Sequence, residues 1–220
     1  GEDSFNFVAS DGTVESPAAT VSITVHPIND APIINSVLIT PSTSKTNEAL
    51  TANVNASDAE GDRLTYTYQW KKNGADISGA ISSMLDLSAS GAGDKGDIIS
   101  VEMIALDLSS TASTLVVSSG VTIANTAPSA ANASIILNED TSATTTLSAL
   151  DPDSGDAFIY EIVTSPDPLL GSLGQVSGNE VLYTPVADAH GADSFIYRAS
   201  DGTDWGNDAT VNVTINSVDD

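Results

Sequence analysis

Acidic residues two positions apart are the side chains of this sequence best suited to chemistry. They occur in Asp58-Ala59-Glu60-Gly61-Asp62 and again in Asp151-Pro152-Asp153-Ser154-Gly155-Asp156. Carboxylates with this spacing in an irregular turn can point to one centre. Calcium takes about 6 to 8 oxygen ligands from carboxylates, amides and carbonyls. Both turns are therefore candidates for calcium binding.

Two further kinds of acidic motif recur along the chain. One is an Asp that ends an alternating apolar run, at Asp11, Asp107 and Asp201. The other is a polar group at a segment boundary, as Asn29-Asp30, Asn125 and Asp219-Asp220. Each motif alone also fits an ordinary turn, because Asn and Asp side chains hydrogen-bond to their own backbone. Their recurrence together at each boundary favours calcium.

Other chemistries have weaker support. Paired carboxylates can hydrolyse glycosidic bonds, but here they lie at segment ends beside Pro-rich linkers, without an aromatic cleft. His26 and His190 have no nucleophile at a motif spacing. We therefore predict that the chain is not an enzyme. Trp205, in a turn, is expected to dock against a neighbouring domain or, alternatively, to stack on a sugar.

The charge of the chain limits its partners. Thirty acidic residues and six basic ones give a net charge of −24, and only Arg198 among the basic residues lies beyond Pro128. Such a surface repels nucleic acid and anionic lipid, so neither nucleic acid binding nor membrane insertion is expected. The acids of the last ninety residues either stay solvated or are neutralised by cations.

The first residues of the chain return near its end. GEDSFNFVASDGT at 1–13 reappears as GADSFIYRASDGT at 191–203, and 19–25 matches 209–215 with the same shift of 190. A constant shift indicates a duplicated unit. Each copy reads as two strands, and a lone pair of strands is marginal in water. We expect 1–30 to complete a preceding domain of a longer chain, or, alternatively, to be exchanged between molecules.

Between these copies, short alternating apolar runs are separated by Gly, Pro, Asn, Asp, Ser and Thr. This pattern predicts antiparallel strands. The fold class is predicted as all-β, with one β-sandwich at 31–127 and another at 128–220. Both are similar in length to an immunoglobulin-type sandwich, which has ~100 residues.

Two stretches resemble known families. YTYQWKKNGADISGA, followed by LDLS and GDKGD, resembles the bacterial immunoglobulin-like repeats of surface proteins, with Trp70 as the core Trp of the third strand. The last unit, through NED, DPDSGDAFIYEI and YTPVADAHGADSFIYRASDG, resembles the cadherin-like tandem repeats of bacterial adhesins, as does 1–30. The resemblance implies tandem Greek-key sandwiches with Ca²⁺ between consecutive domains.

The resemblance also assigns ligands to three junctions. The first is expected to use Asp3, Asn29, Asp30, Asp58, Glu60 and Asp107. The second is expected to use Glu48, Asp97, Asn125, Asp151, Asp153 and Asp201. Glu139, Asp193, Asp219 and Asp220 would serve a third junction. Because Thr126 replaces the Asp of the first linker, the second junction is expected to bind fewer or weaker ions and to be the more flexible one.

These expectations describe a spacer or stalk segment of an extracellular adhesin or filament, stiffened by calcium and secreted or displayed on the cell surface. Its partners would be neighbouring repeats of the same chain or filament. The alternative is a carbohydrate-binding accessory module of a secreted polysaccharide-degrading protein, with polysaccharide as its partner.

Overall fold

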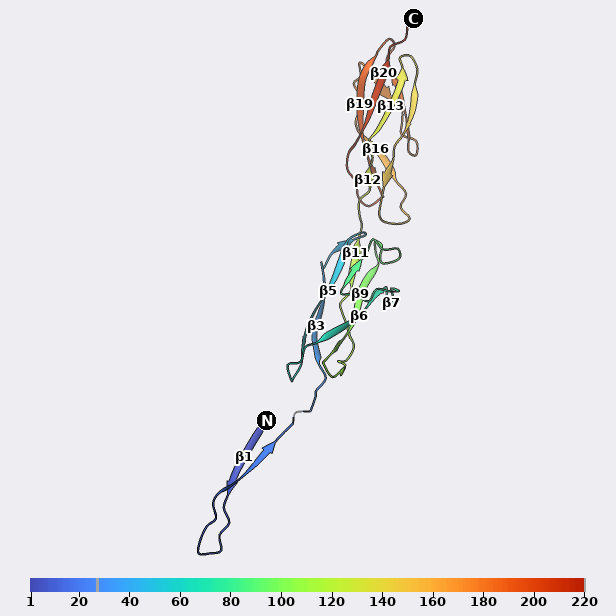
Figure 1. Ribbon diagram of the computed structural model, residues 1–220. Coiled ribbons are helices and arrows are strands. Elements are labelled where there is room, and N and C mark those ends of the chain that lie inside the picture. Colours follow the sequence, from blue (N-terminus) through green and yellow to red (C-terminus); the bar gives the residue numbers. More distant parts are fainter. Residues whose placement is uncertain (27, 220) are drawn as a thin grey trace.

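The protein consists of a β-hairpin and two β-sandwiches arranged in a row (Figure 1). The computed structural model describes residues 1–26 and 28–219. Every regular element in these residues is a strand, which confirms the all-β prediction. Within the described part of the chain, no helix with the length and apolarity of a membrane span is found.

The hairpin is formed by β1 (Glu2–Phe7) and β2 (Ala19–Thr24). It pairs Glu2 with Thr24 through to Phe7 with Ala19, and the corresponding strands of the last unit pair with the same register 190 residues later. The turn repeats as well, because the backbone N–H of Ser16 donates to Ala9 O at 2.8 Å just as that of Gly206 donates to Ala199 O. The duplication therefore extends to individual hydrogen bonds.

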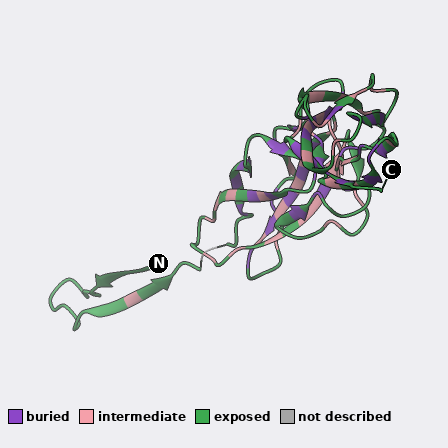
Figure 2. Cartoon of the chain, turned by 90° about the horizontal axis from the view of Figure 1, so that it is seen from above, coloured by how far each residue is buried: buried purple, intermediate pink, exposed green. Residues whose placement is uncertain are grey.

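The surroundings of the two copies differ. Phe5 of the hairpin is 54% exposed, whereas its counterpart Phe195 is fully buried. The hairpin is exposed over almost its whole length, while buried residues gather in the two sandwiches (Figure 2). The first copy thus has the strands but not the core that covers the second.

The first sandwich has two sheets, one ordered β4-β11-β9-β6-β7 with β10 beside β9, and the other ordered β3-β5-β8. Its strands are β3 (Ile33–Thr40), β4 (Ser44–Lys45), β5 (Ala49–Ser57), β6 (Thr65–Lys72), β7 (Ala75–Asp76), β8 (Met84–Asp86), β9 (Ile98–Leu106), β10 (Val116–Val117) and β11 (Val121–Ala124).

The core of this sandwich is built from alternating side chains of the long strands. On β9, Ile99, Val101 and Met103 are buried while their neighbours face outward. Trp70 of β6 is fully buried, and its indole N–H donates to Ser82 O at 2.9 Å. This pairing satisfies the one polar group of the indole, and it confirms Trp70 as the core Trp.

The second sandwich contains a four-stranded sheet ordered β13-β20-β19-β16, a three-stranded sheet ordered β14-β18-β17, and the pair β12-β15. Its strands are β12 (Ser129–Ala130), β13 (Ala133–Asn138), β14 (Ala143–Thr146), β15 (Ala149–Leu150), β16 (Ile159–Thr164), β17 (Gly171–Leu173), β18 (Glu180–Pro185), β19 (Gly191–Ser200) and β20 (Ala209–Asn216).

Strands β19 and β20 form the centre of this unit. Strand β13 runs parallel to β20 on one side, and β16 runs antiparallel to β19 on the other. The Tyr197 hydroxyl reaches across the core to the backbone oxygens of Ala131 and Ser148. Among the described residues, no strand pairs with the outer edges of β1 and β2, and the residues of this hairpin are accordingly exposed.

Candidate metal centre

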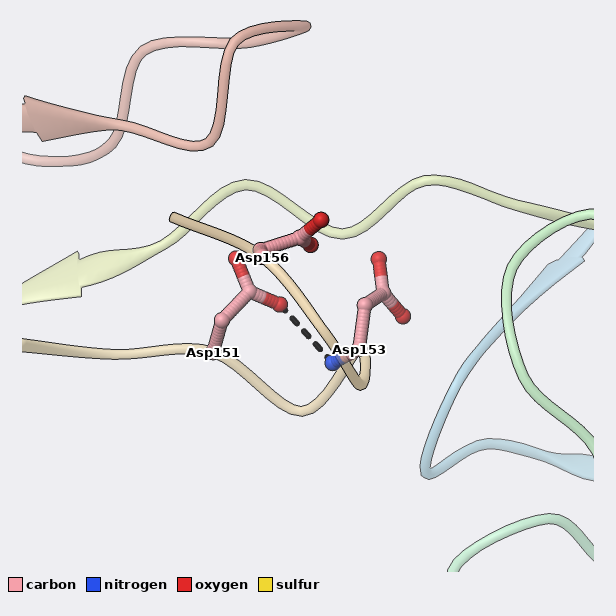
Figure 3. A group of neighbouring side chains, drawn as sticks. All are labelled: Asp151, Asp153 and Asp156. Carbon is pink, nitrogen blue, oxygen red and sulfur yellow. Dashed lines mark hydrogen bonds between the residues drawn. The ribbon is translucent and has the colours of Figure 1, made fainter. Parts of the chain in front are cut away.

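The loop 151–156, which connects β15 to β16, places three carboxylates together where the two sandwiches meet (Figure 3). One oxygen each from Asp151, Asp153 and Asp156 lie within 4.8 Å of one another. The loop is held by its own hydrogen bonds, because the backbone N–H of Asp153 donates to Asp151 Oδ1 at 2.8 Å. The spacing seen in the sequence thus produces convergent side chains.

In each of these three carboxylates, one oxygen has a partner in the protein and the other has none. Asp151 Oδ1 accepts from Asp153 N, Asp153 Oδ2 accepts from Thr126 N at 2.7 Å, and Asp156 Oδ1 pairs with the ammonium group of Lys95. Each second oxygen, Asp151 Oδ2, Asp153 Oδ1 and Asp156 Oδ2, is buried and accepts no hydrogen bond. The side chain of Asp153 is the most enclosed of the three, with 5% of the residue exposed.

The linker adds two oxygens of the same kind. Asn125 Oδ1 and Thr126 Oγ1 are also buried without a hydrogen-bond partner. Leaving a buried polar group unpaired costs about 1 to 3 kcal/mol, and more when the group is charged. Five such oxygens at one place are hard to reconcile with a purely structural role. Carboxylate, amide and hydroxyl oxygens are the ligand types that Ca²⁺ takes, so this donor set fits calcium.

Like charges reinforce this conclusion. Two carboxylate charges 4.8 Å apart repel by about 3.5 kcal/mol at an effective dielectric constant of about 20. Burial raises the pKa of Asp151, and the charges of Asp153, Asp156 and Asp201 also raise it, against the hydrogen bond from Asp153 N. A divalent cation would remove this repulsion.

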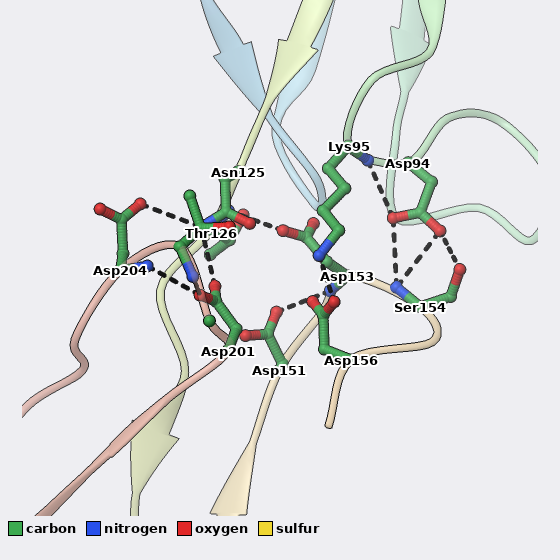
Figure 4. Close-up of polar contacts among 12 residues, drawn as sticks. Asp94, Lys95, Asn125, Thr126, Asp151, Asp153, Ser154, Asp156, Asp201 and Asp204 are labelled. Carbon is green, nitrogen blue, oxygen red and sulfur yellow. Dashed lines mark hydrogen bonds and ion pairs between the residues drawn. The ribbon is translucent and has the colours of Figure 1, made fainter. Parts of the chain in front are cut away.

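The amide group of Asn125 fixes the linker to the second sandwich (Figure 4). Its Nδ2 donates to Asp201 Oδ2 at 2.8 Å and to Asp204 Oδ2 at 2.9 Å. Burial acts to raise the pKa of Asp201, but the hydrogen bonds from Asp204 N, Asn125 and Thr203 N outweigh it, and the pKa is lowered. Asp201 therefore lies at the junction as predicted and orients the linker.

The first junction repeats this framework around Asn29. Asn29 Nδ2 donates to Asp107 Oδ2 at 2.8 Å and to Thr111 Oγ1 at 2.9 Å. The backbone N–H of Asp30 donates to Glu60 Oε2 at 3.1 Å, as Thr126 N does to Asp153. Glu60 N in turn donates to Asp58 Oδ1 at 3.0 Å. The structure thus brings together five of the six residues predicted for this junction.

The two junctions differ in how many buried oxygens are left without partners. At the first junction only Asp58 Oδ2 is of this kind among the described residues, compared with five oxygens at the second. The sequence led us to expect the second junction to be the weaker site because Thr126 replaces an Asp. That order stays a prediction; at the second junction the Thr126 hydroxyl supplies a buried oxygen and its backbone N–H holds Asp153.

Three predicted ligands of these junctions are engaged elsewhere. Glu48 Oε2 accepts from Lys45 N at 2.9 Å and from the Ser44 hydroxyl at 3.1 Å. Asp97 accepts from Asn73 Nδ2 at 2.7 Å and from Asp94 N at 3.0 Å. Asp3 lies on β1 and accepts from the N–H of the adjacent Ser4. In this structure their carboxylates hold local turns and strands, so their role as calcium ligands stays a prediction.

At the far end of the second sandwich the predicted third group is divided. Glu139 is buried and accepts from Val218 N at 2.6 Å, so it reaches the segment that also contains the exposed Asp219. Asp193 instead accepts from the Tyr183 hydroxyl at 2.7 Å and from Asp167 N at 3.0 Å. Its oxygens thus connect two strands of its own unit, and its role at a third junction stays a prediction. Asp220 lies outside the described residues.

Sequence reasoning missed several residues of the second junction. Asp156 belongs to the motif 151–156, but its spacing of three from Asp153 did not identify it as part of the carboxylate cluster. Lys95 and Asp94 belong to the first sandwich and reach the loop of the second, where Asp94 accepts from Ser154 N at 3.2 Å. No pattern within 151–156 predicts a partner about sixty positions earlier in the chain.

Trp205 packs within its own unit. The guanidinium carbon of Arg198 lies 4.5 Å from the centre of the indole ring, and Arg198 also pairs with Glu161 Oε2 at 2.7 Å. The indole remains 43% exposed. Arg198 therefore covers part of the ring that either docking or sugar stacking was expected to use.

Comparison with protein families gives a match to part of the chain. A sequence profile described as a bacterial Ig domain matches residues 125–214, which confirms the resemblance to bacterial immunoglobulin-like repeats. The match falls on the unit whose motifs resemble cadherin-like repeats. No curated protein matches the chain.

Solved structures with similar folds include immunoglobulin-like and cadherin chains. The insect immune protein hemolin is 10% identical over 97% of this chain and 56% of its own, with a TM-score of 0.50. Cadherin domains 1–5 of protocadherin gamma B2 are 18% identical over 100% of this chain and 46% of theirs, with a TM-score of 0.40. An endo-fucoidan hydrolase of glycoside hydrolase family 107 is 18% identical over 100% of this chain and 34% of its own, with a TM-score of 0.34.

The likeness to hemolin concerns the fold alone, and it agrees with the tandem sandwich architecture. The chain spans about half of the length of the protocadherin gamma B2 and hemolin chains that it matches.

Proposed function

We propose, starting from the bacterial immunoglobulin-like family that residues 125–214 match, that this chain is a spacer segment of an extracellular adhesin or filament and that calcium stiffens it. Immunoglobulin-like and cadherin-like domains of this kind are generally extracellular and typically not catalytic. The two sandwiches lie end to end (Figure 1), so the length of the segment depends on the angle at the short linker between them.

The observation that supports calcium most directly is the set of five unpaired buried oxygens at the second junction. They come from the linker and from loop 151–156 of the second sandwich, and Lys95 of the first sandwich lies against the same loop. Asp151, Asp153 and Asp156, with Asn125 and Thr126, would hold the ion. When bound, Ca²⁺ supplies positive charge that offsets the carboxylate repulsion and links the linker to the loop.

The residues of the chain prepare this site without the ion. Thr126 N fixes one oxygen of Asp153, and Asn125 is fixed by Asp201 and Asp204. The linker is therefore positioned before an ion binds, and the first sandwich can still move to the extent that its contacts with loop 151–156 allow. The proposal predicts that calcium reduces this movement.

Small-angle scattering of the full chain, with calcium and with EDTA, tests the proposal. We expect a larger maximum dimension and a narrower distance distribution with calcium. Asp153→Asn should abolish the difference, whereas Glu180→Gln, on an outward-facing position of β18, should retain it. Identical scattering curves in calcium and EDTA would contradict the proposal.

A carbohydrate-binding module is the second candidate, and the partly exposed Trp205 is the observation that favours it. An aromatic ring on a surface turn can stack on a sugar. A pull-down with insoluble polysaccharides compares the wild-type chain with Trp205→Ala. Binding that is lost in the variant would support this candidate, and failure of the wild-type chain to bind would count against it.

A further inference from the structure

We propose that Lys95 is a built-in counter-ion of the second junction, which takes the place of one divalent ion and holds the two sandwiches together when calcium is scarce. The inference rests on the proposed calcium site and adds a residue that limits how many ions it takes. The first observation is the ion pair between the Lys95 ammonium group and Asp156 Oδ1 (Figure 4). Among the described residues it is the one salt bridge that joins the two sandwiches.

The position of Lys95 is fixed by the first sandwich. It stands in the turn 94–97, where Asp97 N donates to Asp94 O at 3.0 Å and Gly96 has a φ of +82°. The turn is fastened to the last strand, because Gly96 N donates to Ile123 O at 2.8 Å and Ile123 N donates to Asp97 O at 2.9 Å. The ammonium group therefore extends from a rigid base next to the linker rather than from a free loop.

Asp94, the residue before Lys95, makes a second contact with loop 151–156. Asp94 accepts from the backbone N–H of Ser154 at 3.2 Å on each oxygen, and also from the Ser154 hydroxyl. Adjacent residues of the first sandwich thus hold Ser154 and Asp156 of the second. The Asp156 side chain is only 10% exposed and that of Lys95 30%, so the pair is largely removed from water. Removing one member of such a pair is costly because it leaves an unpaired buried charge.

Charge explains why Lys95 limits the number of ions. Its ammonium group pairs with Asp156 Oδ1, while Oδ2 of the same carboxylate is buried without a hydrogen-bond partner. A first divalent ion can use the unpaired oxygens. A second would have to approach the side of Asp156 that already has a positive charge, and two like charges at contact distance repel strongly in a partly buried site.

The test compares the full chain with Lys95→Gln and with Lys72→Gln, whose partner Asp97 lies in the same sandwich. Spin labels on the two sandwiches report the distribution of distances between them in EDTA. We expect Lys95→Gln to broaden this distribution and Lys72→Gln to leave it unchanged. Calcium titration by calorimetry should show about tenfold tighter binding, or one additional ion, for Lys95→Gln alone.

The outcomes separate the two proposals. If Lys95→Gln changes neither the EDTA distribution nor calcium binding, the role of Lys95 is wrong while the calcium site stands. If the wild-type chain binds no calcium but Lys95→Gln still broadens the distance distribution in EDTA, the proposed calcium site is wrong. The role of the Lys95–Asp156 ion pair in holding the two sandwiches together then stands. Weaker calcium binding by Lys95→Gln would overturn the counter-ion role.

Discussion

The two junctions use the same framework to different ends. In both, a linker asparagine donates to the Asp that follows a long core strand, β9 or β19, and the next backbone N–H donates to an acidic loop. At the second junction five buried oxygens without hydrogen-bond partners lie within this framework, and Lys95 of the first sandwich pairs with Asp156 of the loop. The framework therefore positions the linker. The residues that the preceding unit places against the acidic loop determine how much carboxylate charge is buried.

The largest difference between the junctions should appear on removal of their central acids. With calcium at 100 times the Kd, binding would stabilise the second sandwich by about 2.7 kcal/mol, which raises the Tm of a unit of this size by about 11 to 22 °C. Asp153→Asn should lose this stabilisation by calcium because it neutralises the most buried carboxylate of the 151–156 cluster. Asp58→Asn, where one unpaired oxygen is buried, should change the calcium response less. Calorimetric unfolding with calcium and with EDTA measures both.

A greater loss for Asp58→Asn than for Asp153→Asn would reverse the order of the two junctions. Glu180→Gln serves as the control for the loss of one negative charge in the same sandwich, and its calcium response should equal that of the wild-type chain.

The second difference concerns packing at the linker. Gly206 N donates to Ala199 O at 2.8 Å, and the same bond is made by Ser113 to Ala105 O in the first sandwich. A Cβ at Gly206 would lie 1.9 Å from Pro128 O, so only glycine permits this approach to the linker. Gly206→Ser should therefore destabilise the second sandwich by about 1 to 3 kcal/mol, although it restores the residue found at the equivalent position. Thermal unfolding in EDTA gives the value.

The matched variant for this prediction is Ser113→Gly. It removes a hydroxyl that accepts from Ala105 N at 3.0 Å, so a loss of about 0.5 to 1.5 kcal/mol is expected. If Gly206→Ser is no less stable than the wild-type chain, the close approach to Pro128 is not what fixes this junction.

The smallest effect is electrostatic. The pKa of Asp107 is lowered, first by the hydrogen bond from Asn29 and further by those from the Thr111 and Ser109 backbone, against a smaller effect of burial. The hydrogen bonds to the Asp107 carboxylate therefore stabilise the folded protein at pH values above 3.8, the ordinary pKa of Asp. This stabilisation is lost as the pH falls through the lowered pKa of Asp107. Asn29→Ala should raise the pKa of Asp107 toward 3.8, and NMR titration of the carboxyl carbon measures the change. An unchanged pKa would show that Asn29 does not hold Asp107.

Much of the fold follows from local pattern. Alternating apolar residues locate β9 and β20, and the repeated motif predicts that β1–β2 and β19–β20 share a register. The acidic loops and linker asparagines are also found by pattern, because turn chemistry and ligand spacing depend on neighbouring residues. These are the parts of the site that the structure brings together.

What the sequence did not predict depends on contacts between distant segments. The hydrogen bond from the Tyr183 hydroxyl to Asp193 is one such contact, between two strands of one unit. The ion pair of Lys95 with Asp156 spans 61 positions and two domains. Such contacts decide which oxygen of each carboxylate remains unpaired, so the sequence alone does not identify the unpaired oxygens.

The exposed hairpin has a consequence for how these residues behave in solution. Its outer edges present unpaired backbone N–H and C=O groups, and Phe5 and Phe7 lie on a face that water contacts. Bare edges beside apolar side chains are templates for pairing between molecules. A strand of a neighbouring domain or of a second molecule could therefore pair with these edges, by a route that neither chelators nor the acidic junctions control.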